Sequence, residues 1–139
     1  MTRDEWKARS KELERSAVTL LANGRHDLAY HSAGIAVECG LKAKIATLFM
    51  ANDVPEKKFV EDFYREGHNL VRLVGLAQLQ AQLDTEERAR PEFRANWATV
   101  RAWTIDSRYK AWSQIEATEM VKAATQRGSG VLSWIRRHW

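Results

Sequence analysis

Apolar residues recur at helical spacing along most of this chain, and no segment shows the strict alternation of a strand. The pattern predicts a first helix from about Thr2 to Ala22, where Asn23-Gly24 supplies a stop signal. A second helix is expected from about Asp27 to Met50. Its residues are small or aliphatic on most sides, which indicates a central, covered position in the fold.

Helix-capping and helix-breaking residues divide the rest of the chain. In order, the sequence predicts a short helix opened by Asp53 and Pro55, a loop at EGHNL, a helix over 70–83, a helix that Asp84-Thr85 caps and Pro91 starts or interrupts, a break at TIDSRYKAWS, and a last helix from about Gln114 toward Arg136. Gly128 and Gly130 are expected to weaken or kink the last helix. The prediction is an all-α up-and-down bundle of four main helices with short extra helical turns, forming one domain over residues 1–139.

One stripe of the second predicted helix carries ionisable side chains. His31, Glu38 and Lys42 share this stripe at helical spacing. The far face holds small residues that allow another backbone to approach closely: Ala33, Ala36, Gly40, Ala43 and Thr47. Helical bundles build their sites between facing helices, so the stripe is the first place to look for function.

The partner of Glu38 is the main question that this stripe raises. Lys42 lies four residues later, a spacing that favours an ion pair, and an exposed pair of this kind contributes roughly a few tenths of a kcal/mol. The small and apolar neighbours favour instead a partly buried carboxylate, which needs a strong donor from elsewhere in the fold. We expect Arg108, in DSRYKAW, to form a structural ion pair with Glu38, because a guanidinium binds a carboxylate through two hydrogen bonds and stays charged when desolvated.

Composition narrows the class of protein. With 139 residues, 45% hydrophobic and 29% charged, the chain has the size and balance of one globular domain. No apolar run is long enough for a membrane span, and the charged amino end MTRDEWKARSKELERS lacks an apolar signal region, so we expect a cytoplasmic location. Cys39 is the only cysteine, which excludes an intramolecular disulfide, and the four histidines are scattered without zinc-site spacing. No metal and no cofactor are expected.

Charge and aromatic content suggest partners. The formal net charge of +4 and the isoelectric point near 9.4 mildly favour polyanions such as RNA. The last third of the chain contains Trp97, Trp103, Trp112 and Trp134, which is more aromatic surface than one small bundle readily buries. We therefore expect a homodimer.

Three segments resemble the HEPN family in the expected order. GRHDLAYHSAGIAVECGLKAKI is similar to the second helix of HEPN domains, which carries small residues, an acidic position and a lysine one turn later, here Ala33, Glu38, Leu41 and Lys42. GHNLVRLV resembles the entry into the family's next helix, and WATVRAWTIDSRYKAW resembles a helix with spaced tryptophans that ends in an Arg-Tyr pair. The resemblance covers most of residues 13–136. It implies a helical bundle that often forms symmetric dimers with a polar groove at the junction, and links to RNA or nucleotide chemistry in bacterial defence and toxin-antitoxin systems.

The chain departs from HEPN ribonucleases at their late motif, in which four to six residues separate an arginine from a histidine. After Arg108 the sequence reads YKAWSQI, and although Arg25 and His31 match the spacing, they lie in the wrong helix. We expect a non-catalytic HEPN-type binding protein that engages RNA, a nucleotide or a partner nucleotidyltransferase. Two alternatives stay open: a metal-independent HEPN endoribonuclease with the non-standard set Arg108, His31 and Glu38, and a plain protein-interaction bundle.

The candidate binding residues are ionisable and aromatic groups of the predicted groove and of the carboxyl end: His31, Lys42, Arg108, Tyr109, Arg136 and Arg137. His31 is expected to be a hydrogen-bonded groove or core histidine rather than a catalytic base, and His68 to cap or anchor a loop. The Tyr109 ring is expected to pack while its hydroxyl forms a hydrogen bond. In SWIRRHW, two arginines between aromatic residues suit phosphate contact and base stacking, with a frayed helix end as the alternative.

Overall fold

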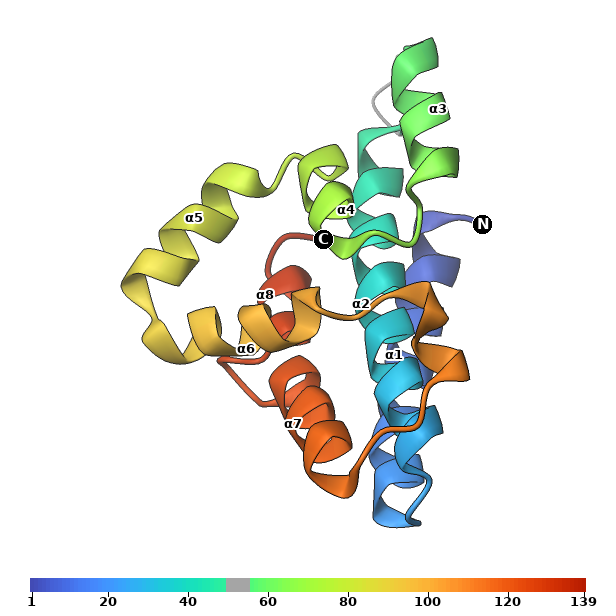
Figure 1. Ribbon diagram of the computed structural model, residues 1–139. Helices are drawn as coiled ribbons and strands as arrows, with labels where there is room; N and C mark the ends of the chain where they lie inside the picture. The colour runs from blue at the N-terminus through green and yellow to red at the C-terminus, as the bar shows by residue number, and fades with distance from the viewer. Residues whose placement is uncertain (50–55) are drawn as a thin grey trace.

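The computed structural model describes residues 1–49 and 56–139, and within these ranges the chain is helical and contains no strand (Figure 1). The elements are α1 (Arg3–Ala22), α2 (His26–Leu48), α3 (Lys57–Arg65), α4 (Leu70–Leu76), α5 (Gln80–Ala89), α6 (Pro91–Arg101), the 3-10 helix η1 (Ile105–Tyr109), α7 (Gln114–Thr125) and α8 (Val131–Arg136). The helices pack against each other as a bundle, which confirms the all-α prediction. The predicted signals at Met50, Asp53 and Pro55 lie outside the described residues.

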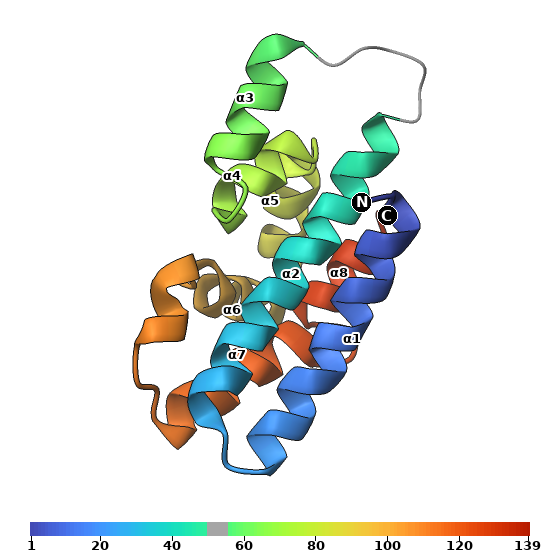
Figure 2. The ribbon, with the colours of Figure 1, turned by 90° about the vertical axis from the view of Figure 1, so that its right-hand side faces the viewer.

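Helix α1 begins and ends at the predicted signals. The Thr2 hydroxyl accepts the amide of Glu5 at 3.2 Å, and the Glu5 carboxylate accepts the amide of Thr2 at 2.6 Å, which completes a capping box. After α1, Gly24 has a φ of +72°, a conformation that glycine adopts without steric strain. The chain then reverses, and Figure 2 shows α1 and α2 side by side as an antiparallel pair.

Helix α2 is the centre of the fold, in contact with α1, α4, α7, α8 and η1. Its small residues allow this close packing: a Cβ atom on Gly40 would lie 3.3 Å from a side chain of α8 and 3.4 Å from the hydroxyl of Ser10 in α1. That hydroxyl donates a hydrogen bond of 2.7 Å to the carbonyl of Ala36. Glu38 and Lys42 are buried in these surroundings, so the covered position predicted for this helix is confirmed.

The helix predicted over 70–83 is divided into α4 and α5. Gln78 has a φ of +58°, which ends α4 and starts the turn into α5. The turn buries Leu79 and Leu83 in the core, a tertiary gain that outweighs the local cost of the backbone conformation. The predicted cap at Asp84-Thr85 is wrong because both residues lie inside α5, whereas Pro91 occupies the first turn of α6 as predicted.

The last predicted helix is also divided rather than kinked, into α7 and α8. Gly128 has a φ of +82°, and a Cβ atom on Gly130 would lie 2.3 Å from the carbonyl oxygen of Gln126. Both positions therefore require glycine, and the backbone turns back between Thr125 and Val131.

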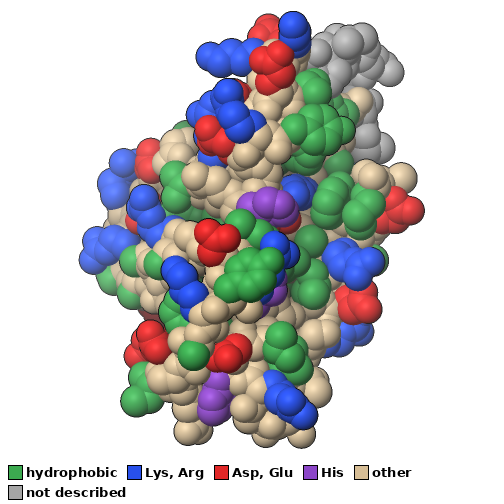
Figure 3. All heavy atoms as spheres, turned by 45° about the vertical axis from the view of Figure 1, so that its right-hand side comes forward, with side chains coloured by type: hydrophobic (Ala, Val, Ile, Leu, Met, Phe, Trp, Pro, Cys, Tyr) green, Lys and Arg blue, Asp and Glu red, His purple; other side chains and the backbone are tan. Residues whose placement is uncertain are grey.

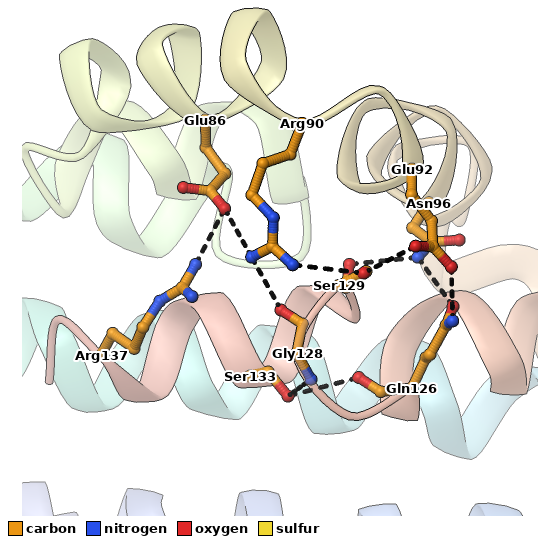
Figure 4. A network of polar contacts seen from close by, with 9 residues as sticks. All are labelled: Glu86, Arg90, Glu92, Asn96, Gln126, Gly128, Ser129, Ser133 and Arg137. Atoms are coloured by element: carbon orange, nitrogen blue, oxygen red, sulfur yellow. Dashed lines mark hydrogen bonds and ion pairs between the residues drawn. The ribbon is translucent and has the colours of Figure 1, made fainter.

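A polar network holds this turn against the junction of α5 and α6 (Figure 4). The Arg90 guanidinium donates to Glu86 at 3.0 Å and to the carbonyl of Gly128 at 3.2 Å. Glu92 accepts the Ser129 hydroxyl at 3.0 Å, and its hydrogen bonds lower the pKa of its carboxyl group. The network fixes the carboxyl-terminal helices on the rest of the bundle.

The tryptophans are largely buried within the single chain. Trp97, Trp103 and Trp134 are each no more than 2% exposed. Trp112 stacks on Tyr30 with 3.6 Å between ring centroids. The argument that these aromatic residues exceed the capacity of one bundle is therefore wrong, and a homodimer needs other support.

Candidate functional site

One face of α2 is bordered by the loop between α3 and α4 and by η1. In Figure 2, α3 and α4 (green) and η1 (orange) lie on one side of α2, and α1 lies on the other. Figure 3 shows basic, acidic and histidine side chains gathered over the middle of the surface, with hydrophobic side chains beside them. The stripe of α2 thus meets residues from two later parts of the chain.

Glu38 is the buried charge at the centre of this face. Its carboxylate is 4% exposed, and its two oxygens accept hydrogen bonds from the Lys42 ammonium at 3.0 Å and from Nδ1 of His68 at 2.7 Å. The ammonium of Lys42 also lies 5.2 Å from the ring centre of Trp6 and 5.6 Å from that of Phe63. Lys42 is therefore enclosed by its partners, and the prediction that it binds a ligand is wrong.

Arg108 is not the partner of Glu38, so the predicted ion pair is wrong. Within the described residues, Arg108 forms no ion pair at all. The place that a guanidinium would need is filled by His68. The loop carrying His68 approaches closely because Gly67 has no side chain: a Cβ there would lie 2.7 Å from the carbonyl oxygen of Phe63. His68 anchors its loop, as expected.

Arg108 and Tyr109 instead form an exposed pair, which we call the Arg108–Tyr109 platform. The guanidinium carbon lies 4.7 Å from the centre of the tyrosine ring. Tyr109 is 76% exposed, so the expectation that its ring packs in the fold is wrong. The short η1 helix turns both side chains outward while Ser107, between α2 and the platform, is buried.

His31 is the part of the stripe nearest to η1. Its Nδ1 atom lies 2.9 Å from the hydroxyl of Ser107, and its ring is tilted against Trp103 with 5.7 Å between centroids. Burial and then the charge of Arg108 lower the pKa of His31, and the charge of Glu38 opposes them. These features agree with the expectation of a half-buried, hydrogen-bonded histidine beside Arg108.

The carboxyl-terminal arginines are engaged within the fold. Arg136 is paired with Glu14 of α1, and Arg137 lies 2.9 Å from Glu86 of α5. Both side chains therefore hold α8 to other helices rather than presenting unpaired charge. The prediction that they contact phosphate is not supported by this arrangement, and the end of the chain is not a frayed helix with solvated charges.

A hollow of about 690 Å³ opens beside His68, between the α3–α4 loop and the end of α6. Its lining residues are Arg65, Glu66, His68, Asn69, Val71, Arg101, Trp103, Thr104 and Ile105. A volume of this size is within the range of small-molecule sites. Trp103 reaches the hollow because it lies on Gly34 of α2, where a Cβ atom would be 2.3 Å from the indole.

Sequence reasoning found the polar stripe but missed the residues around it. His68 carried a signal in the Gly-His pair of its loop, since a glycine beside a histidine permits a close backbone approach. Ser107 and Arg101 carried none, because their roles depend on which segments meet in space. His31 and Arg108 share the face, whereas Glu38, the third member of the non-standard ribonuclease set, is enclosed by Lys42 and His68.

Other chemistry is limited on this part of the chain. Burial and the nearby Glu38 raise the pKa of the Cys39 thiol to about 11, so it is an uncharged packing group. Within residues 1–49 and 56–139, no group of three or more metal-ligating side chains is assembled, and no helix is long and apolar enough to cross a bilayer. Comparisons with family models, curated proteins and solved structures find no match to this chain.

Proposed function

We propose that this protein is a non-catalytic HEPN-type binding protein that holds single-stranded RNA on the face containing Arg108, Tyr109 and His31. The observation that carries the proposal is the Arg108–Tyr109 platform, an exposed aromatic ring with a guanidinium 4.7 Å from its centre. Bases stack on aromatic rings in a sequence-tolerant way, and guanidinium groups bind the phosphates between them. Arg108 has no carboxylate partner within the described residues, so its charge is available to phosphate.

The HEPN resemblance supplies the setting of this proposal. It favours a homodimer, a role in bacterial defence or in a toxin-antitoxin pair, and a nucleotidyltransferase as partner protein. A nucleotide is the smallest ligand that offers the same base and phosphate, so it belongs to the same binding chemistry.

The test is the affinity for a labelled single-stranded RNA, measured by fluorescence anisotropy over a range of salt concentrations. We expect Arg108→Ala to weaken binding and to reduce the slope of log affinity against log salt by about one, because one phosphate contact is lost. Tyr109→Ala should weaken binding with a smaller change in that slope. The matched control is Arg88→Ala, which removes the same charge from an exposed position on α5, across the molecule from η1 in Figure 1. Equal losses for Arg88→Ala and Arg108→Ala contradict the proposal.

A ribonuclease is the second candidate, and the nearness of His31 to Arg108 favours it. A neutral imidazole can accept the proton of a 2′-hydroxyl, and an arginine can stabilise the phosphorane. Gel analysis of the RNA after the binding experiment separates the candidates. Intact RNA supports the binding protein, and metal-free cleavage that His31→Ala abolishes supports the enzyme. RNA that neither binds nor is cleaved favours the plain protein-interaction bundle.

A further inference from the structure

The hollow beside His68 has a positively charged wall with unmatched charge. Its acidic residue, Glu66, lies 3.3 Å from the guanidinium of Arg72 and 4.0 Å from that of Arg65. The same two arginines pair with the buried Asp62, at 2.8 and 2.6 Å, so this group of four charges is balanced. Arg101, which lines the other side, forms no ion pair within the described residues. The hollow therefore carries a net positive charge.

His68 adds a directed polar group to this wall. The Glu38 carboxylate only accepts hydrogen bonds, so the 2.7 Å contact requires the proton of His68 to be on Nδ1. The other ring nitrogen, Nε2, is then left for the hollow, and the side chain is 56% exposed there. Lys42, at 3.0 Å from the second carboxylate oxygen, fixes Glu38 behind the histidine. The imidazole is thus held in one orientation before any ligand arrives.

Neutral and apolar groups complete the hollow. Asn69 accepts the amide of Arg72 through its side-chain oxygen at 3.1 Å, which leaves its amide nitrogen as a donor. Thr104 adds a hydroxyl group, and Val71 and Ile105 give an apolar part to the lining. Donors on one side and apolar contacts on the other suit a small organic molecule with one anionic end.

We propose that this hollow binds a phosphomonoester group, held by Arg101 and by Nε2 of His68. A phosphomonoester carries nearly two negative charges at neutral pH and three terminal oxygens, whereas an internal phosphodiester carries one charge and two such oxygens. An arginine fork and an imidazolium that is backed by a carboxylate match the monoester better in charge and in number of donors. The group can come from a free phosphorylated small molecule or from the phosphorylated end of an RNA. This site is separate from the Arg108–Tyr109 platform and does not depend on it.

The direct test uses methyl phosphate and dimethyl phosphate in one sample, observed by phosphorus NMR at about pH 7.5, where the monoester is a dianion. We expect the monoester to bind about tenfold more tightly than the diester. His68→Asn is the sharpest variant, because the asparagine amide can replace Nδ1 toward Glu38 while Nε2 is removed. Arg101→Ala removes the other ligand. Both variants should lose the monoester preference, and the control Arg94→Ala, an exposed arginine on the same helix, should keep it.

Melting temperatures of the variants show whether each one is folded. Equal binding of the two methyl esters, or an unchanged preference in folded His68→Asn and Arg101→Ala, overturns the proposal. If His68→Asn does not fold, the exposed Arg101→Ala decides the question alone.

A second arm identifies the source of the phosphate. It compares internally labelled RNAs that carry a phosphate at the 5′ end, at the 3′ end or at neither end. Tighter binding of one phosphorylated RNA, lost in Arg101→Ala, supports an RNA end as the ligand. Equal binding of all three RNAs together with a methyl phosphate preference supports a free small molecule. Methyl phosphate binding without any RNA binding refutes the proposed RNA function and leaves the hollow assigned, whereas RNA binding without a monoester preference does the reverse.

Discussion

Nδ1 of His68 lies 2.7 Å from a carboxylate oxygen of Glu38, and this contact joins the α3–α4 loop to the middle of α2. The two residues are 30 positions apart in the chain. Glu38 is 4% exposed, and Lys42 holds its other oxygen. A buried carboxylate with donors on both oxygens is stable only while those donors stay in place, so the loop and the helix hold each other in position.

Loss of Glu38 should be far more costly than loss of Arg108. Glu38→Ala leaves Lys42 buried without a counter-charge, and we expect it to lower the free energy of unfolding by on the order of 3 kcal/mol. Arg108→Ala removes an exposed side chain without an ion pair in the described fold, and should change the same quantity by less than about 0.5 kcal/mol. Urea denaturation of both variants measures the difference. Comparable losses in the two variants would mean that Arg108 supports Glu38 after all.

Gly34 and Gly75 give a matched pair of helical glycines with opposite surroundings. A Cβ atom on Gly34 would lie 2.3 Å from the indole of Trp103, whereas one on Gly75 in α4 would meet nothing within 4 Å. Gly34→Ala should therefore destabilise the protein by about 2 kcal/mol or more, since Trp103 is buried and has to move. Gly75→Ala should stabilise it by about 0.5–1 kcal/mol through the better helix propensity of alanine. Denaturation midpoints test both signs, and a neutral Gly34→Ala would contradict the described packing.

The local features of this fold were predictable from sequence, and the long-range ones were not. The cap at Thr2, the stop at Gly24 and the start at Pro91 depend on neighbouring residues only, so their signals are complete in the sequence. The turn at Gln78 has no such signal, because burial of Leu79 and Leu83 against other helices stabilises it.

The candidate site follows the same rule. Burial of Glu38 could be inferred from the small and apolar residues of its own helix. Its partner could not, since His68 and Arg108 both offer a cationic or polar group and only the path of the α3–α4 loop decides between them. The platform was missed because its side chains sit on a 3-10 turn, where helical periodicity does not tell which residue faces outward.

The homodimer remains a prediction, now with a different physical basis. Leu28, Tyr109 and Ile115 are 54%, 76% and 71% exposed. A hydrogen bond of 2.6 Å from the Trp112 amide to Asp27 brings the start of α2 next to the segment that leads into α7. Apolar side chains exposed together at one end of a small domain favour self-association. Light scattering at tens of micromolar protein should give about twice the mass of 16.0 kDa, and Ile115→Asp should lower it. A monomeric mass for the wild type contradicts the prediction.

The half-buried His31 should make the fold less stable in mild acid. Its pKa is lowered by burial and by Arg108, so at pH values below the ordinary histidine value of about 6.5 the unfolded chain takes up a proton that the folded chain resists. The stability contributed by neutral His31 is therefore present above this pH and is lost as the pH falls below it. His31→Asn can keep a polar contact to Ser107 without titrating, so the stability difference between wild type and variant should shrink as the pH falls from about 7.5 to 5.5. Arg108→Ala removes one cause of the lowered pKa and should weaken the effect. Urea denaturation at several pH values measures these differences, and a difference that stays constant or grows in acid would show that His31 is not disfavoured in its charged form.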